Sequence, residues 1–483
     1  MRTPEFEMGL KLDEKQPAMG RDRGRARPLA RGREVTFTPE ADPSPPWFAG
    51  KTWGVFLLTL YPLLAVAPLV IFATLNRVSD HLRAAEVGVD CAVVGVTILA
   101  LQFSLTARLS WVEAPFGLDV LLLFHRAMAL VATALLCAHP VLVAREEGWP
   151  LLAGWHVHWY IWVGRLALAL LLLQVVVSLS RGVIRLPYDK WRRLHNPIAL
   201  AILTLGFVHS LAAGDDMHGG ALFVWGAVMA VAVGFWLYSR VVRPRLLLRN
   251  PFRVIGVKSE APHVWTLTLE PRGDRSLHFA PGQFQFLRLH GAEVPSEEHP
   301  FTIASSPTRP GRISLTIKES GDFTAAIGRV RLGDRATVHG PFGRFSHTLH
   351  RDEGDLVFVA GGVGITPLMS MLRHMRDRSE RRRVLLAYAS RGAEHVLFAE
   401  ELEAMQTAGY PMLRVVHVLA VAHQSWTGET GMLDAERLVR LCGGAQDKAF
   451  YLCCPPPMTT ALIRGLRRMR VSPRRIHSDY FSL

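Results

Sequence analysis

Cysteine is scarce in this sequence of 483 residues, which contains only Cys91, Cys137, Cys442, Cys453 and Cys454. Their number is odd, and their spacing provides neither a C-x₂-C pair nor a plant-type ferredoxin run. The chain therefore builds no disulfide scaffold, no Cys₄ zinc ribbon and no Cys₄ iron–sulfur cluster. EF-hand loops and N-x-S/T sequons are also missing, which argues against direct calcium control and gives no sign of glycosylation.

Acidic residues are also in deficit, because 41 Asp and Glu stand against 55 Lys and Arg and leave a formal charge of +14. Apolar residues nevertheless make up 49% of the chain and charged residues only 20%. A soluble basic protein does not combine these values, so the composition predicts two dissimilar parts. The length allows about three domains at roughly 150 residues each.

The first 46 residues form a polar, Pro- and Gly-rich arm with six crowded arginines: Arg21, Arg23, Arg25, Arg27, Arg31 and Arg33. We expect residues 1–46 to be disordered, as a solvated tail on the cytoplasmic side of a membrane, with a nucleic-acid arm as the alternative. No apolar core of about 7–15 residues closely follows the initiator methionine, so we expect no cleavable signal peptide.

Six apolar stretches follow, near 53–75, 86–107, 118–144, 157–179, 194–213 and 219–240. Each approaches the roughly 20 residues that a helix needs to cross about 30 Å of hydrocarbon. The sequence therefore predicts a six-helix transmembrane domain over residues 47–245.

Basic residues follow the fourth and sixth stretches, at Arg181, Arg185, Lys190, Arg192 and Arg193, and at Arg240, Arg243, Arg245 and Arg249. By the positive-inside rule these ends are cytoplasmic. We expect a multi-pass protein of the cell membrane with both termini in the cytoplasm. The excess positive charge is then better explained by the orientation of the protein in the membrane and by phosphate-bearing ligands than by binding of nucleic acid.

Four histidines show the most informative spacing. His125 and His139 lie 14 residues apart in the third stretch, and His195 and His209 lie 14 apart in the fifth. Fourteen residues are close to four helical turns, so each pair shares a helix face over about 21 Å. Because both helices run from inside to outside, His125 should face His195 near the cytoplasm, and His139 should face His209 near the far side. Two six-coordinate haem irons would fit between them.

A lone membrane histidine more often packs or relays protons, but the repeated spacing favours two haems. The segment GLDVLLLFHRAMALVATALLCAHPVL resembles the transmembrane domain of the ferric reductase and NADPH oxidase family. This resemblance implies two b-type haems. Arg126 and Arg165, also within apolar segments, would pair with haem propionates or snorkel to an interface. His156 and His158 read as interfacial residues, with contact to a metal acceptor as the alternative.

Beyond Asn250, alternating runs such as VWTLTLE, FQFLRLH and RISLTIK predict an antiparallel β-barrel over residues 250–350. From 351 to 483, strands alternate with helical segments, which predicts an α/β domain with a parallel, Rossmann-like sheet. The expected protein is thus multidomain: a helical bundle, a barrel and a nucleotide-binding domain.

The barrel contains PGQF at 281–284 and HPFTIASSP at 299–307. These motifs resemble the FAD-binding barrel of the ferredoxin–NADP reductase superfamily, in its membrane branch, with His299 where the broader superfamily has Arg. Phe301 offers its ring to the isoalloxazine, and Thr302 a hydroxyl near flavin N5. The resemblance implies that five further residues bind the diphosphate and the flavin: His299, Pro300, Lys318, Gly321 and Thr324. The alternative is that they are ordinary strand and turn residues.

The first strand of the α/β region ends in AGGVGITPLMSML. Gly361, Gly362 and Gly364 would let the backbone approach a nucleotide diphosphate at a helix N-terminus, with Thr366 capping the helix and Pro367 at its first position. Ser390 and Arg391 follow the second strand, where NAD-specific folds often place an acid. They favour NADPH, with NADH possible, over the alternative of a merely solvated arginine.

YLCCPPPM resembles the family's nicotinamide motif, with Cys454 or Cys453 as the matching cysteine, although either thiol also reads as a small buried hydrophobe. Phe481 resembles the terminal aromatic residue that covers the flavin, with Tyr480 as runner-up and a frayed tail as the alternative. The resemblance thus places Thr302, Cys454 and Phe481 at the reacting centre.

Nicotinamide delivers two electrons as a hydride, haem accepts one at a time, and flavin does both. The expected order is therefore NADPH, FAD, inner haem, outer haem, and then an acceptor outside the membrane. Oxygen, giving superoxide, is the leading acceptor, and a ferric chelate is the close alternative, to which Asp215, Asp216 and His218 in an outer loop add weak support. A haem conduit to a periplasmic partner protein and a membrane-anchored flavin reductase are further alternatives.

Overall fold

The structure is a computed structural model, which describes residues 50–76, 83–214, 219–273, 277–309 and 311–479. The predicted basic arm, the outer-loop residues Asp215, Asp216 and His218, and the terminal residues Tyr480 and Phe481 lie outside this part of the chain.

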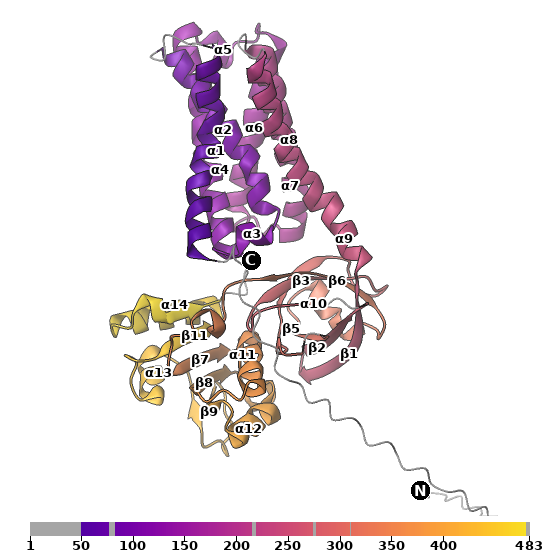
Figure 1. The fold of residues 1–483 in the computed structure, drawn as a ribbon, viewed down its shortest axis with the longest axis vertical. Helices are drawn as coiled ribbons and strands as arrows, with labels where there is room; N and C mark the ends of the chain where they lie inside the picture. The colour runs from indigo at the N-terminus through magenta and orange to yellow at the C-terminus, as the bar shows by residue number, and fades with distance from the viewer. Residues whose placement is uncertain (1–49, 77–82, 215–218, 274–276, 310, 480–483) are drawn as a thin grey trace, which may run out of the picture. The chain divides into compact units, whose positions relative to one another are not determined.

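Long helices lie side by side in the N-terminal half (Figure 1). They are α1 (Lys51–Asn76), α2 (Ala84–Thr106), α4 (Leu118–Glu147), α6 (Trp159–Ser180), α7 (Tyr188–Ala213) and α8 (Gly220–Leu237), with short α3 (Ser110–Glu113) and α5 (Pro150–Ala153) between them. Within the described residues, six helical segments are long and apolar enough to cross a membrane. These segments confirm the predicted six-helix bundle.

Many large apolar side chains are exposed on the surface of the bundle, as expected for side chains that contact lipid rather than water. Leu63 and Phe223 are 67% and 82% exposed. One polar group inside the bundle has its partner there, as hydrocarbon favours: the buried Trp225 indole donates to Ser210 Oγ at 2.6 Å. The sixth segment is longer than expected, because α8 passes through a π-helical turn (Tyr238–Val242) into α9 (Arg243–Arg249).

An antiparallel sheet of six strands follows α9. Its strands are β1 (Phe252–Ala261), β2 (Val264–Pro271), β3 (Phe284–Leu289), β4 (Glu298–Thr302), β5 (Ile313–Lys318) and β6 (Arg335–Phe342), in the order β4-β3-β6-β1-β2-β5. The two ends of this order meet just after β4, where Ala304 N–H donates to Ser314 O of β5 at 2.8 Å. Inward-facing side chains such as Leu267, Leu287 and Leu315 are fully buried and form the core. The predicted antiparallel FAD-type barrel is confirmed.

The C-terminal sheet is parallel throughout, in the order β10-β9-β8-β7-β11-β12. Its strands are β7 (Leu356–Gly361), β8 (Arg383–Ser390), β9 (Met412–Leu419), β10 (Glu429–Thr430), β11 (Ala449–Cys453) and β12 (Ile476–Ser478). Helices α11 (Ile365–Asp377), α12 (Ala399–Ala408), α13 (Ala435–Cys442) and α14 (Pro456–Arg468) connect them. Two separate apolar cores cover the two faces of this sheet, as expected for a doubly wound fold.

Candidate functional site

Two pairs of imidazoles lie between α4 and α7. The ring centroids of His125 and His195 are 6.5 Å apart, and those of His139 and His209 are 6.2 Å apart. If one metal ion joined two imidazoles, each metal–nitrogen bond would be about 2 Å long. Adding the distance from each nitrogen to the centre of its ring gives about 6 Å between the two ring centroids. Both pairs, which the structure joins as the sequence predicted, therefore fit an iron ligated by two histidines.

The outer pair is held by backbone carbonyl groups. His139 Nδ1 lies 3.0 Å from Gly88 O, and His209 Nδ1 lies 2.8 Å from Tyr160 O. A carbonyl oxygen only accepts, so each Nδ1 carries the proton and each Nε2 keeps a lone pair for a metal. A Cβ at Gly164 would lie 2.9 Å from His209 Nδ1, so only glycine lets α6 approach this ring.

The inner pair has a different environment. Nδ1 of His125 and Nδ1 of His195 are buried, and neither has a hydrogen-bond partner among the residues that the structure describes. The Trp191 ring packs on His195 with centroids 4.6 Å apart. Buried imidazole nitrogens normally have a partner, so these two polar atoms mark a place that a further group completes.

The two arginines of the apolar segments behave differently. Arg165 donates to the carbonyl oxygens of Gly154 at 2.7 Å and Leu151 at 2.9 Å, at the end of α5. Its guanidinium thus has backbone partners within the described chain. The sequence had led us to expect either a haem propionate or the membrane interface as its surroundings, and it did not predict these carbonyl groups. Arg126 is exposed on α4. His156 and His158 are exposed too, and His158 stacks on Tyr160 with centroids 5.3 Å apart, as suits an interfacial residue.

Three aromatic rings gather where β4 meets α10 (Asp322–Ala325). The ring of His299 lies 4.4 Å from that of Phe323, and Phe301 stacks on Phe323 with centroids 6.0 Å apart. Pro300 pairs with Phe286 of β3, and Thr302 is buried at the end of the strand. The HPFT motif and the ESGDFT turn therefore come together, as one flavin site requires.

The ESGDFT turn already uses some of its donors. Thr324 Oγ1 accepts hydrogen bonds from the backbone N–H groups of Ser320 at 2.7 Å and Gly321 at 2.9 Å. The N–H group of Gly321, a residue that the resemblance assigned to this site, thus has a partner within the chain. Lys318 is exposed at the end of β5, where its ammonium group is accessible to an anion.

The glycine-rich turn after β7 packs against the end of β11. A Cβ at Gly364 would lie 2.0 Å from Cys453 O, and one at Gly361 would lie 2.6 Å from Pro455 Cδ. Gly362 differs, because it has a φ of +55° and open space around it. Two of the three glycines therefore join the two nucleotide motifs to each other, and Gly362 is the one with room for a ligand.

Helix α11 begins with Ile365, and Gly364 occupies its N-cap position. Thr366 is therefore not the N-cap that the sequence predicted: its hydroxyl donates to Val363 O at 3.0 Å instead of accepting from a helix N–H. Pro367 is the third helical residue and not, as the sequence predicted, the first, but it still lies in the first turn, where a missing N–H costs no helical hydrogen bond. The early start follows from the 3₁₀ turn at Gly362–Gly364, which leads directly into the helix.

Both motif cysteines are buried in opposite cores, Cys453 on the α11 side and Cys454 on the other. Burial raises the pKa of Cys454 to about 12, and its Sγ lies 3.5 Å from Val359 O. Burial also raises the pKa of Cys453. Since the thiolate is the reactive form, these thiols serve packing and shape rather than nucleophilic chemistry.

Ser390 is buried at the carboxyl end of β8, whereas Arg391 is exposed beside it. Arg391 forms no ion pair within the described ranges. An exposed cation at the carboxyl end of a parallel strand is placed to meet a charged nucleotide.

Sequence reasoning missed a polar network between the bundle and the barrel. Arg108, just beyond α2, donates to Glu298 Oε2 at 2.8 Å and lies 3.5 Å over the Phe286 ring. Arg192 Nη2 lies 3.8 Å from the same carboxylate. Burial alone would raise the pKa of Glu298, but Arg108 and its neighbours outweigh it and lower that pKa to about 2. Arg108 also has a φ of +52°, an uncommon conformation that aims its side chain at this pair.

A second contact joins the same two domains. Gly343 N–H donates to Glu113 Oε1 at 2.9 Å, and Arg344 Nη1 donates to Ala114 O at 2.6 Å. Glu113 is only 3% exposed, and this burial raises its pKa to about 7. The one sequence signal for these contacts was the placement of charged residues beside motifs, namely Glu298 before HPFT and Arg344 after GPFG.

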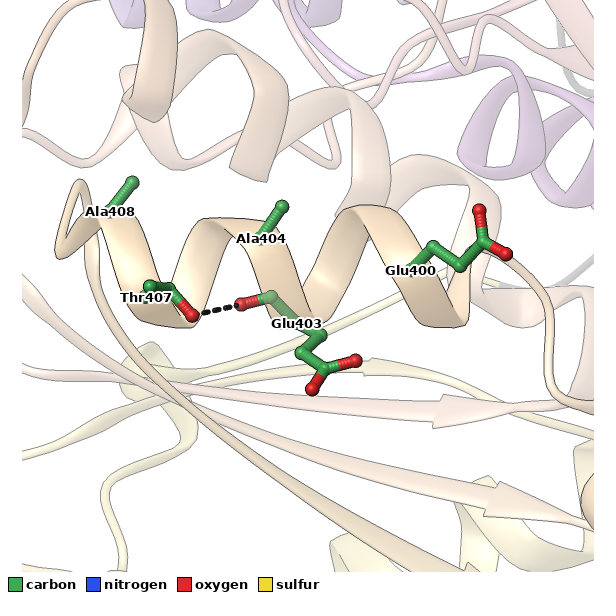
Figure 2. A pocket seen from close by; sticks show the side chains of 5 residues that line it. All are labelled: Glu400, Glu403, Ala404, Thr407 and Ala408. Carbon is green, nitrogen blue, oxygen red and sulfur yellow. Dashed lines mark hydrogen bonds between the residues drawn. The ribbon is translucent and has the colours of Figure 1, made fainter.

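A surface depression on α12 carries no site. It is lined by Glu400, Glu403, Ala404, Thr407 and Ala408 of this one helix (Figure 2). Thr407 merely donates to Glu403 O at 3.1 Å, an ordinary bond within a helix. All five lining residues come from a single helix, so they do not form the kind of enclosed pocket that ligand sites usually have.

Three domain families match the chain in the order of its three folded domains. "Ferric reductase like transmembrane component" matches residues 91–206, "FAD-binding domain" matches 253–353, and "Oxidoreductase NAD-binding domain" matches 358–463. This order of domains is an NADPH oxidase/ferric reductase-like architecture. The ferric reductase match includes three of the four paired histidines, His125, His139 and His195, and ends three residues before His209.

Curated relatives of this ferric reductase-like chain include the phenol hydroxylase P5 protein of Acinetobacter pittii, which is 30% identical over 239 residues, 47% of this chain and 64% of the relative. NADH-cytochrome b5 reductase 1 of Aspergillus oryzae is 29% identical over 272 residues, 52% of this chain and 91% of the relative. The chain thus spans less than two thirds of the first of these proteins.

Among solved structures, the Amycolatopsis cytochrome P450 reductase GcoB is 25% identical, with a TM-score of 0.43 over 48% of this chain and 69% of that one. The domain matches and the reductase relatives support an NAD(P)H-dependent transmembrane oxidoreductase.

Proposed function

We propose that this chain is an NADPH oxidase-like enzyme that carries electrons from cytoplasmic NADPH across the cell membrane to oxygen and produces superoxide. The observation that carries the proposal is the double pairing of histidines between α4 and α7, with ring centroids 6.5 and 6.2 Å apart. Because the two pairs are 14 residues apart along both helices, they provide two positions at different depths in the bundle.

When bound, FAD would convert a hydride into single electrons, and two b-type haems would carry single electrons. The chain's residues hold these groups: His125 and His195 would ligate the inner iron, and His139 and His209 the outer one. The carbonyls of Gly88 and Tyr160 keep the outer imidazoles in the tautomer with a free Nε2.

The residues of the barrel and of the nucleotide-binding domain would bind and orient the flavin and the nucleotide. The Phe301 ring and the Thr302 hydroxyl would position the flavin, and the turn at Gly362 and exposed Arg391 would receive the anionic nucleotide. An arginine suits a 2′-phosphate, which supports NADPH over NADH. Buried Cys453 and Cys454 would shape the nicotinamide site without exchanging protons near neutral pH, because burial raises the pKa of both thiols.

Contacts of the barrel support a cytoplasmic reductase module. Glu297 and Glu298 bind Arg193 and Arg192, which belong to the basic segment that begins α7. Positively charged membrane-flanking segments favour the cytoplasm. These contacts support a barrel on the cytoplasmic side, where the positive-inside rule would put both termini.

Oxygen is the proposed acceptor because two imidazoles would hold each iron and leave it no open site, which suits outer electron transfer rather than gas binding. Reduction of a ferric chelate is the second candidate. The family that matches residues 91–206 favours it, since it is described as a ferric reductase-like transmembrane component.

The test is NADPH-driven reduction of external cytochrome c, with and without superoxide dismutase, followed by reduction of a ferric chelate without oxygen. We expect dismutase to abolish the signal, and His139→Ala and His209→Ala to abolish external reduction while flavin reduction by NADPH persists. Exposed His156→Ala is the matched control. Dismutase-insensitive delivery to the chelate would replace the oxidase assignment with that of a ferric-chelate reductase, and normal external reduction by both variants would refute the two-haem route.

A further inference from the structure

A cluster of two histidines and one carboxylate lies outside the proposed electron route. The possible ligand atoms of His350, Glu353 and His477 all lie within 4.8 Å of one another. The rings of His350 and His477 stack with centroids 4.1 Å apart, and His477 Nε2 lies 2.6 Å from Glu353 Oε1. The side chains of His477 and Glu353 are only 15% and 9% exposed, so the cluster is largely shielded from water.

Two segments supply the three residues of this cluster. His350 and Glu353 belong to the connection between β6 and β7, whereas His477 lies on the edge strand β12. Among the strands that the structure describes, β12 pairs with β11 alone, through Phe450, Tyr451 and Leu452. The cluster therefore joins the entry of the nucleotide-binding domain to the last strand of its sheet.

We propose that His350, Glu353 and His477 bind a divalent transition-metal ion of the zinc class. Two imidazoles and one carboxylate are a donor set that zinc and its neighbours favour, whereas calcium and magnesium prefer oxygen ligands alone. Three protein ligands leave a fourth tetrahedral position for water.

Small movements of side chains would bring the three ligand atoms to the distances that a bound metal ion requires. Bonds of about 2.0–2.2 Å in a tetrahedral site place ligand atoms roughly 3.3–3.5 Å apart. The 2.6 Å contact between His477 and Glu353 must open slightly, and His350, within 4.8 Å, must approach. Rotation of the half-buried His350 ring provides this movement without displacing a strand.

Tyr451 supplies the outer contact that metal-bound carboxylates usually have. Its hydroxyl donates to Glu353 Oε2 at 2.6 Å, which leaves Oε1 for the ion. The Tyr451 ring is fully buried, which fixes the direction of that hydrogen bond.

The experiment uses the untagged full-length chain in detergent, dialysed against buffered zinc chloride, with bound zinc counted by mass spectrometry. We expect one zinc per chain, lost in His477→Ala and in Glu353→Gln, and unaffected by excess calcium. Tyr451→Phe keeps the ring in its core and should weaken zinc binding by about 10- to 100-fold. Zinc should also raise the thermal unfolding midpoint of the wild type but not of Glu353→Gln.

His263→Ala is the matched control. His263 is also paired with a glutamate, Glu319, at 2.8 Å, but its side chain is 75% exposed and has no second histidine beside it. This variant should keep the zinc. Circular dichroism and flavin content establish that each variant is folded.

Absence of stoichiometric zinc in the wild type would overturn the proposal, as would retention of that zinc in folded His477→Ala and Glu353→Gln. Either result would leave a hydrogen-bonded His–Glu–Tyr network as the role of the cluster. Zinc binding is measured without NADPH or an electron acceptor, so the outcome is independent of the proposed oxidase activity.

Discussion

Substitution of Glu298 by glutamine tests whether the bundle–barrel contact is electrostatic. The carboxylate is paired with Arg108 at 2.8 Å, and the two side chains are only 10% and 13% exposed. Glutamine keeps the shape and one acceptor oxygen but removes the charge. Arg108 would then be a buried cation with no ionised partner at this carboxylate position.

The expected cost follows from two routes that agree. Removal of one partner from a buried ion pair costs about 3–5 kcal/mol. Lowering the pKa of Glu298 from 4.5 to about 2 corresponds to about 3 kcal/mol in favour of the folded, ionised state. A carboxyl group with a lowered pKa stabilises the folded state fully when the pH is above its ordinary pKa. This stabilisation is lost as the pH falls toward its lowered pKa of about 2. The whole contribution is therefore present at neutral pH.

The first assay is thermal unfolding of the purified chain at pH 7. At roughly 2–4 °C per kcal/mol for a domain of 150–250 residues, we expect the midpoint to fall by about 6–12 °C. The second compares NADPH-driven reduction of an impermeant acceptor with reduction of ferricyanide by the reductase module. A loss of about 3 kcal/mol in docking lowers the docked-to-undocked ratio about 100-fold. The first activity should therefore fall at least tenfold while the second persists.

Glu297→Gln is the control at the adjacent position. Glu297 also pairs with an arginine, Arg193, at 2.8 Å, but the arginine side chain is 70% exposed. Such a surface pair contributes only about 0–1 kcal/mol. If Glu298→Gln and Glu297→Gln share the same midpoint and the same external rate, buried charge does not hold the barrel on the bundle.

Three further substitutions test other contacts. Gly164→Ala, whose Cβ would lie 2.9 Å from a ring atom of the outer histidine pair, should lower haem content by dithionite difference spectra, while Gly226→Ala, with open space around it, should not. Glu113 has a pKa raised to about 7, so folding favours its protonated form and the wild type should lose up to about 3 kcal/mol of stability as the pH rises from about 4.5 to about 7. Glu113→Gln should remove that slope in unfolding measured between pH 5 and 8, and an unchanged slope would contradict the assignment. Gly364→Ala places a Cβ 2.0 Å from Cys453 O and should destabilise the nucleotide-binding domain by about 1–3 kcal/mol, with NADPH affinity reduced in titration; unchanged affinity and melting would refute the close packing.

Much of the fold was predictable from local pattern. Apolar length identifies membrane helices because the bilayer imposes a fixed thickness. Alternation and glycine-rich turns identify the barrel and the parallel sheet, since a strand repeats every two residues. The histidine pairing was also accessible, because a 14-residue interval on two helices of the same direction fixes both depth and face.

The sequence by itself thus determined the order of domains, the six membrane helices and the two depths at which histidines face one another. Only the tertiary structure decided that Gly361 and Gly364 contact the end of β11, that Arg165 binds backbone carbonyls, and that Glu298 joins the barrel to Arg108. The physical reason is distance along the chain. Helical and strand periodicity act between near neighbours, whereas these contacts join residues whose proximity exists only after the domains have packed.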